Sequence, residues 1–109
     1  MYFSLDGKLQ GTIITDLKRP ASLALHGDYL AVGEVSGGRI VLLDKEGKIV
    51  AQMGPNSTLE GVGVNTTPPE KWQPGQVTAP HGLAFTPQGD LLASEFNLFG
   101  RVHRFVKDK

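Results

Sequence analysis

The chain has 109 residues, of which 39% are hydrophobic and 20% are charged, and this balance indicates one small globular domain. Eleven lysines and arginines balance eleven aspartates and glutamates, and there is no basic stripe, so neither nucleic acid nor an anionic membrane is an expected partner. Cysteine is absent, which excludes disulfides and thiolate metal sites but leaves the cellular compartment open.

Short runs rich in Val, Ile, Leu and Phe follow one another along the chain, separated by glycine and proline. No window has the apolar period of a long helix, so we predict an all-β protein. The first residues already form a strand-turn-strand pattern and lack the two regions of a signal peptide. In chain order the predicted strands are Tyr2–Leu5, Leu9–Ile14, Ser22–Leu25, Tyr29–Glu34, Arg39–Leu43, Ile49–Met53, Gly82–Phe85, Leu91–Phe96 and Arg101–Val106.

A repeated unit underlies these strands. The turn sequence "LDGK" at Leu5–Lys8 returns as "LDKEGK" at Leu43–Lys48, and "RFVKDK" at Arg104–Lys109 begins a third copy. The interval before the third copy is longer because of the segment 55–79, which is rich in proline and has no strand alternation. A loop of that length is usually functional or disordered, so we interpret 55–79 as an inserted loop.

Two long stretches of the chain align once the insert is set aside. Repeats of this length made only of strands favour a propeller of four-stranded antiparallel blades. We therefore divide the chain into the end of one blade (1–16), a complete blade (17–54), the inserted loop (55–79) and a last blade that lacks its outer strand (80–109). The alignment pairs Pro20 with Pro80, Leu30-Ala31 with Leu92-Ala93, Glu34 with Glu95, and Gly38-Arg39 with Gly100-Arg101.

The succession P-x-x-[LI]-A, G-D, an acidic residue, G-R-[IV] and D-x-x-G-K resembles NHL-type β-propeller repeats. The end of the chain, "PHGLAFTPQGDLLASEFNLFGRVHRF", is similar to the last blade of bacterial six-bladed propellers of this kind. The resemblance covers nearly the whole chain apart from the insert and implies a closed ring of blades. About two blades are present, so we interpret the chain as a piece of a longer propeller. The alternative is a homo-oligomer that completes a ring.

His81 begins the innermost strand of the last blade, which in a propeller lies near one mouth of the central channel. The resemblance implies one role for it, because some NHL-like propellers are amidating lyases that hold zinc with histidines from several blades. Catalytic zinc usually takes three protein ligands, and His26 and His103 are not expected to converge on His81. We assign no metal site and no cofactor. His81 stays a candidate ligand-binding residue, with ordering of the strand start as its structural alternative.

Glu34 and Glu95 occupy matching places at the ends of second strands, and Arg101 and its counterpart Arg39 each follow a glycine. The two glutamates could bind a cation or a substrate amine at the same mouth as His81. Their repetition in both units favours a structural role, in which each carboxylate bonds an arginine or the backbone N–H groups of the following turn. Trp72, the only tryptophan, lies in the insert and either stacks on a ligand or pins the loop to the blade.

No arrangement of residues in the sequence is recognisably catalytic, so whether the chain is an enzyme stays open. The preferred interpretation is a binding or scaffold module that presents propeller loops to a protein, a peptide or a glycan. The alternative is part of a metal-dependent lyase or hydrolase with His81 near the channel. A chain without independent activity is the third possibility, because fold does not dictate function.

Overall fold

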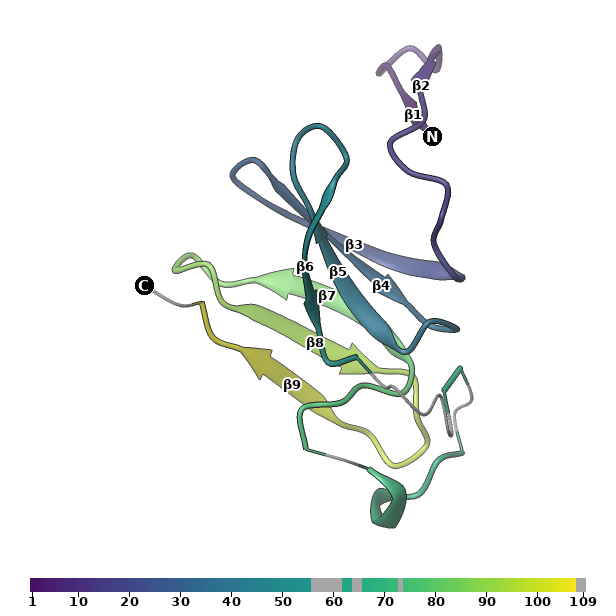
Figure 1. Ribbon diagram of the computed structural model, residues 1–109, viewed down its shortest axis with the longest axis vertical. Coiled ribbons are helices and arrows are strands. Elements are labelled where there is room, and N and C mark those ends of the chain that lie inside the picture. Colours follow the sequence, from purple (N-terminus) through teal and green to yellow (C-terminus); the bar gives the residue numbers. More distant parts are fainter. Residues whose placement is uncertain (56–61, 64–65, 73, 108–109) are drawn as a thin grey trace.

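Three antiparallel sheets make up the computed structural model, which describes residues 1–55, 62–63, 66–72 and 74–107 (Figure 1). The predicted all-β class is confirmed, and the described residues contain no α-helix. The only helical element among them is a short 3₁₀ turn, Pro69–Lys71, within the predicted insert. The strands are β1 (Tyr2–Phe3), β2 (Leu9–Gly11), β3 (Pro20–His26), β4 (Tyr29–Glu34), β5 (Arg39–Leu43), β6 (Ile49–Met53), β7 (Pro80–Phe85), β8 (Leu91–Glu95) and β9 (Val102–Phe105).

Each sheet is a simple meander in which every strand pairs with the next one along the chain. Strands β1 and β2 form a hairpin, β3 to β6 form a four-stranded sheet, and β7 to β9 form a three-stranded sheet. Tight turns make this order possible, and the predicted turn role of Asp44 is confirmed. Its carboxylate accepts hydrogen bonds from the amides of Glu46 and Lys48, and Gly47 supplies the positive φ of 84° that the turn requires.

Both faces of the four-stranded sheet are apolar because hydrophobic residues occupy successive positions of β4 and β5. We call the face of the four-stranded sheet that is directed toward the three-stranded sheet its forward face, and the opposite one its rear face. In the three-stranded sheet, the face that packs against the four-stranded sheet is called the rear face, and the opposite one is called the forward face. The forward face of the four-stranded sheet carries Ala24, Ala31, Ile40, Leu42 and Met53. Its rear face carries Leu23, Leu25, Leu30, Val32, Val41 and Leu43.

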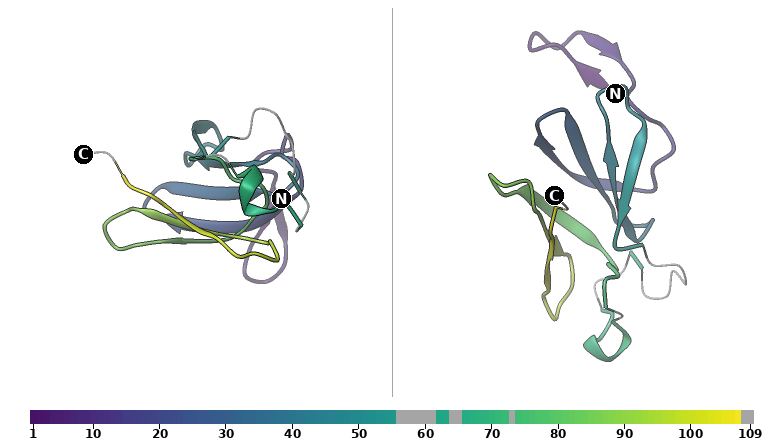
Figure 2. Two further views of the ribbon diagram at one scale, coloured as in Figure 1. Left: turned by 90° about the horizontal axis from the view of Figure 1, so that it is seen from below. Right: turned by 60° about the vertical axis from the view of Figure 1, so that its left-hand side comes forward.

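The main core lies between the two larger sheets, which stack face to face with β3 and β4 in contact with β7 (Figure 2). Ala31 and Ile40 of the forward face are fully buried there against Leu91 and Ala93 of β8. Val77, just before β7, fills the same core and is also fully buried. Dry packing of this kind is the dominant stabilising contribution in a small all-β domain.

The rear face of the four-stranded sheet is covered only in part. Ile14 and Leu17, from the segment that leads into β3, pack over the buried Val32 and Val41. Leu23 and Leu25 on β3 lie beyond this cover and remain 64% and 74% exposed. The segment therefore covers the middle of the rear face and leaves the β3 side of that face exposed to solvent.

The two larger sheets repeat the same local structure, but the predicted alignment of their second strands is wrong by one residue. Pro20 pairs with Glu34 and Pro80 pairs with Glu95, and a β-bulge follows at the same place in both sheets. Counting back from the glutamates makes Leu30-Ala31 equivalent to Leu91-Leu92 rather than to Leu92-Ala93. The hairpin between β7 and β8 is longer than the one between β3 and β4, so the gap in the alignment belongs in that turn.

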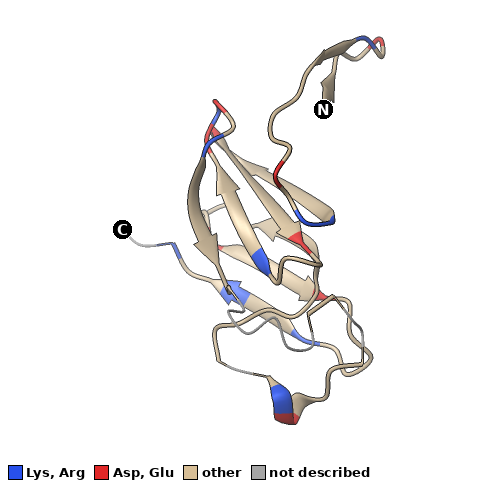
Figure 3. Ribbon diagram, turned by 45° about the vertical axis from the view of Figure 1, so that its right-hand side comes forward, with Lys and Arg blue, Asp and Glu red and all other residues tan. Residues whose placement is uncertain are grey.

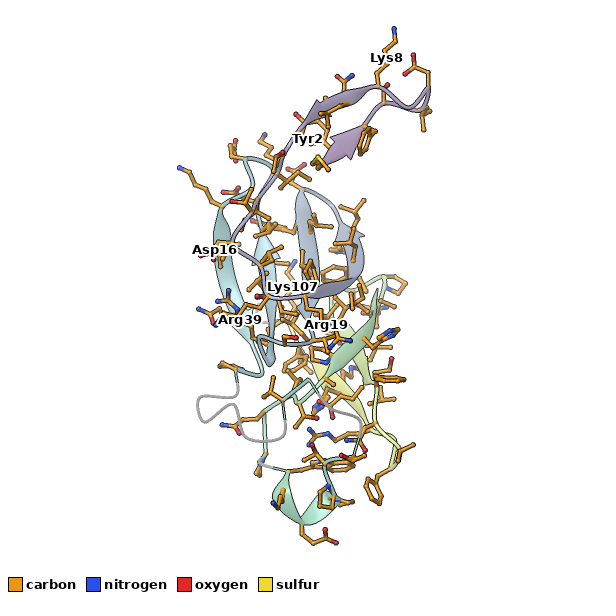
Figure 4. All side chains as sticks on the ribbon, turned by 90° about the vertical axis from the view of Figure 1, so that its right-hand side faces the viewer. Tyr2, Lys8, Asp16, Arg19, Arg39 and Lys107 are labelled. Atoms are coloured by element: carbon orange, nitrogen blue, oxygen red, sulfur yellow. The ribbon has the colours of Figure 1, made fainter. Side chains whose placement is uncertain are left out.

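The N-terminal hairpin stands apart from the two stacked sheets, as the positions of Tyr2 and Lys8 show in Figure 4. The apolar side chains of this hairpin are largely open to solvent, with Phe3 55% and Leu9 58% exposed. The three sheets are open and do not close into a ring.

Candidate binding surface

Glu95, at the end of β8, is buried at the centre of a polar network. Its Oε1 accepts a hydrogen bond from the Thr78 amide, and its Oε2 accepts one from Arg101 Nε at 2.8 Å. The Nε2 atom of His103, on β9, lies 3.6 Å from Oε1. Burial alone raises the pKa of this carboxyl, but the His103 imidazole, Arg101 and the Thr78 amide outweigh burial and lower the pKa to about 2.

Glu34 repeats this arrangement at the end of β4. Its buried carboxylate accepts hydrogen bonds from the Lys18 amide at 2.8 Å and from Arg39 Nε at 2.5 Å. The backbone follows the same pattern, because the Val35 amide donates to Arg19 O as the Phe96 amide donates to Ala79 O. Each glutamate thus ties the segment that enters its sheet to the turn that leaves the second strand.

The pairing of each glutamate with an arginine agrees with the structural interpretation of these residues. The backbone partner differs from the expected one, because the amides belong to the segment before the sheet and not to the turn after the strand. Arg101 is further engaged, since its Nη2 donates to Gln76 O at 2.9 Å. Glu34, Glu95 and Arg101 therefore stabilise the fold of the two larger sheets, and their charges are paired within the molecule.

Trp72 pins the described part of the insert to the three-stranded sheet. Its Nε1 donates to Thr67 O at 3.2 Å, and the Arg101 guanidinium carbon lies 4.3 Å from the centroid of its ring. The base of the insert is closed by a hydrogen bond of 2.9 Å from the Val77 amide to Gly54 O. Of the predicted loop 55–79, residues 56–61, 64–65 and 73 lie outside the described residues.

The turn between β8 and β9 is fastened to the same insert, and sequence reasoning missed it. Asn97 Nδ2 donates to Thr67 O at 3.1 Å, and Asn97 Oδ1 accepts a hydrogen bond from the Phe99 amide at 2.9 Å. These bonds hold a turn on which Leu98 and Phe99 are exposed to solvent, at 74% and 53%, next to Phe96, which is 55% exposed. We call Leu98 and Phe99 the apolar tip.

The first repeat shows that the apolar tip is not required by the fold. At the corresponding turn it has the small residues Ser36, Gly37 and Gly38, although the glutamate and arginine that brace the turn are the same. The sequence signal was therefore visible as a difference between the repeats. Large exposed apolar side chains on a braced turn are typical of a contact surface.

The three histidines lie beside three different aromatic rings. His81, the second residue of β7, is exposed with its ring centroid 5.5 Å from that of Phe96. His26 lies against Phe85 and His103 against Phe105, at 5.2 and 5.9 Å. No group of three metal-ligating side chains occurs among the described residues. The metal-dependent alternative built on His81 therefore gains no support from them.

Charged residues gather mainly at turns and strand ends, which leaves most of the sheet surfaces uncharged (Figure 3). Asp90 is one of these residues, directly before β8. Its carboxylate accepts hydrogen bonds from the Lys107 amide and from Arg104. Those two contacts, the Lys107 amide first, lower the pKa of Asp90. Asp90 therefore fastens the chain after β9 to the hairpin between β7 and β8.

A cavity of about 390 Å³ opens between the two larger sheets at the end opposite the glutamates. Its walls include Leu42, Val50 and Phe85, and its polar groups come from His26 and Lys107. Its lining also includes Ala51 of β6 and Gly89 of the turn between β7 and β8, so residues of both larger sheets enclose it.

Comparisons with protein-family models, curated proteins and solved structures found no match to the chain. In the part of the chain that the structure describes, no helix is long and apolar enough to cross a bilayer. The class that the fold and the surface define is thus an all-β protein of repeated antiparallel sheets with an apolar tip beside a pinned insert.

Proposed function

We propose that the chain is a segment of an NHL-repeat-like β-propeller that acts as a binding scaffold. In this proposal the two larger sheets are successive blades, and the insert and the neighbouring turn form the surface offered to a partner. The partner is a protein or a peptide that contributes apolar side chains. The observation that carries the proposal is the apolar tip, held by Asn97 on a turn that is braced by Glu95 and Arg101.

The propeller part of the proposal is supported by the duplicated frame. Both sheets begin at a proline paired with a buried glutamate, carry a bulge at the same position and are tied to an incoming segment by that glutamate. They stack face to face with β3 next to β7, as first strands do in adjacent blades. A duplicated unit that buries its apolar faces only by stacking is the defining property of repeat architectures.

The binding part is supported by the rigidity of the tip. An apolar side chain that is already fixed loses little conformational entropy when a partner covers it, so more of the contact energy appears as affinity. The hydrogen bonds of Asn97 to the Phe99 amide and to Thr67 O hold the backbone that carries Leu98 and Phe99, so less of this entropy is lost there than on a free loop. A glycan would need polar groups that converge on the site, and the tip offers apolar side chains.

A random-peptide library displayed on phage tests the binding proposal. We expect panning on the chain to enrich peptides with aromatic or aliphatic side chains. Their affinity, measured by titration calorimetry with a synthetic peptide, should fall roughly tenfold or more when Leu98 and Phe99 are both replaced by serine.

The matched control replaces Leu23 and Leu25 by serine, because these residues are similarly exposed but lie on the rear face. This variant should keep the full peptide affinity. If no peptide is enriched, or if the two double variants weaken binding equally, the apolar tip is not a binding surface.

A further inference from the structure

Two sheet faces remain uncovered in the described residues, one at each end of the stack. The rear face of the four-stranded sheet exposes Leu23 and Leu25, at 64% and 74%. The forward face of the three-stranded sheet exposes Leu92 and Val102, at 36% and 70%. Contiguous apolar surface of this kind is rare on a monomer and marks an interaction site.

The packing inside the chain indicates what fits each face. The rear face of the three-stranded sheet brings Leu83 and Phe85 onto the forward face of the four-stranded sheet. By strand register, the exposed Leu23 and Leu25 occupy the positions of Leu83 and Phe85 in the other sheet. The uncovered rear face of the four-stranded sheet is therefore equivalent, by register, to the rear face of the three-stranded sheet, which is buried inside the chain.

The uncovered forward face of the three-stranded sheet is likewise equivalent to a buried face, the forward face of the four-stranded sheet. Its Ala84 and Leu92 form a register pair equivalent to Ala24 and Ala31, which belong to the buried interface. The exposed forward face of the three-stranded sheet is thus equivalent to the forward face of the four-stranded sheet, which packs on a rear face inside the chain. The molecule exposes an equivalent rear face at its other end, on the four-stranded sheet.

An apolar side chain from the segment before the first strand packs at the internal interface, and an equivalent side chain packs on the free rear face. Val77 fills the core between the sheets one residue before Thr78, whose amide binds Glu95. Leu17 packs on the free rear face one residue before Lys18, whose amide binds Glu34. The free rear face is therefore already formed and lacks only the neighbouring sheet.

We propose that the chain associates head to tail with a second copy of itself. In this assembly the forward face of the three-stranded sheet of one copy packs on the rear face of the four-stranded sheet of the next. The contact extends the stacking already present inside the chain, and it joins two different surfaces, so it is heterologous. It rests on the packing of the sheets and not on the proposed peptide binding.

One residue of the forward face departs from the internal pattern. Arg104 takes the register position of Leu42, and its guanidinium is held by Asp90 at 2.6 Å. The aliphatic part of an arginine side chain covers apolar surface while its charged end stays in water. We therefore place the Arg104–Asp90 pair at the rim of the contact.

A complementation experiment tests the head-to-tail geometry. Leu25→Asp spoils only the rear face and Leu92→Asp spoils only the forward face. In light scattering at increasing concentration, the unchanged chain should form dimers or larger species, whereas each variant alone should remain a monomer. An equimolar mixture of the two variants should form a dimer, because one intact forward face and one intact rear face are then available.

The control is Leu98→Asp, which changes an exposed apolar residue outside both faces and should leave association unchanged. Circular dichroism establishes that each variant is folded, and Val102→Asp replaces Leu92→Asp if the latter unfolds. An unchanged chain that is monomeric at every concentration overturns the proposal. So does a mixture that does not dimerise, or association that only one of the two aspartate variants abolishes, which is the behaviour of a contact between like faces.

Discussion

A single buried carboxylate, that of Glu95, joins three separated parts of the chain. Its partners are Thr78 at the end of the insert, Arg101 after the β8–β9 turn and His103 on β9. A buried ion is tolerated only when its oxygen atoms are supplied with donors, and removal of one partner leaves the others unpaired. Glu95 should therefore contribute strongly to stability although it lies near the proposed binding surface.

The acid sensitivity of the fold provides a test of this role. The pKa of Glu95 is lowered from 4.5 to about 2, so its stabilising contribution is complete above the higher value and is lost as the pH falls toward the lower one. Glu95→Gln should reduce the free energy of unfolding at neutral pH by about 2–3 kcal/mol. The variant should also flatten the decline in stability between about pH 5 and pH 2, measured by urea unfolding at several pH values.

The control for this experiment is Glu70→Gln, because Glu70 is an exposed residue of the 3₁₀ turn. This variant should leave both the stability and its pH dependence close to those of the unchanged chain. If Glu95→Gln keeps the full acid-induced decline, other carboxyl groups cause it.

At the scale of the elements, Gly54 is the residue at which β6 gives way to the insert. Its φ is +62°, and a Cβ there would lie 2.8 Å from Val77 Cγ1 and 3.3 Å from Phe105. Gly54→Ala therefore combines a left-handed backbone with crowding of the core. We expect a loss of about 2–4 kcal/mol in the free energy of unfolding, measured by chemical denaturation.

Gly75 offers a matched control in the same insert. Its φ is +73°, and a Cβ there would meet nothing within 4 Å. Gly75→Ala should cost only the backbone contribution, roughly 1 kcal/mol. Equal losses for the two variants would show that the contact between Gly54 and Val77 is not tightly packed.

Every strand was predictable because the repeats combine β-branched runs with glycine turns, a local pattern that the fold preserves. The register of the second repeat was not. The turn between β3 and β4 contains only Gly27 and Asp28, whereas the one between β7 and β8 spans 86–90, so matching Leu30-Ala31 to Leu92-Ala93 was wrong by one residue. Turn length depends on how a hairpin closes, and the order of apolar residues does not reveal it.

The candidate residues divide in the same way. Repetition was enough to indicate that Glu34 and Glu95 are structural, but not that their donors come from residues before the sheet, because those contacts span the chain and form only on folding. The tip residues Leu98 and Phe99 were missed because the alignment stopped at the glycine and arginine beside them. Their exposure follows from the turn that Asn97 builds.

At the scale of the whole molecule, the N-terminal hairpin should be the least stable part. An isolated two-stranded hairpin is marginal in water, and this one buries little apolar surface. We expect the Ser4 amide, which donates to Lys8 O, to exchange its hydrogen with little protection. The amides of Ala31 and Val41, in the middle of the four-stranded sheet, should be protected to the level of global unfolding.

Hydrogen exchange followed by NMR measures this gradient directly. Similar protection of Ser4 and Val41 would mean that the hairpin unfolds together with the sheets. In that case contacts that the exposed fractions do not reveal would couple the two.

The bond between Val77 and Gly54 has a consequence for how the chain can change over evolutionary time or be engineered. Because it closes the base of the insert, new sequence placed between these residues does not have to reposition the sheets on either side. Doubling the length of such a closed loop costs only about 0.6 kcal/mol in chain entropy. The insert is thus a natural graft point, where foreign recognition sequences can be exchanged while the sheets keep their packing.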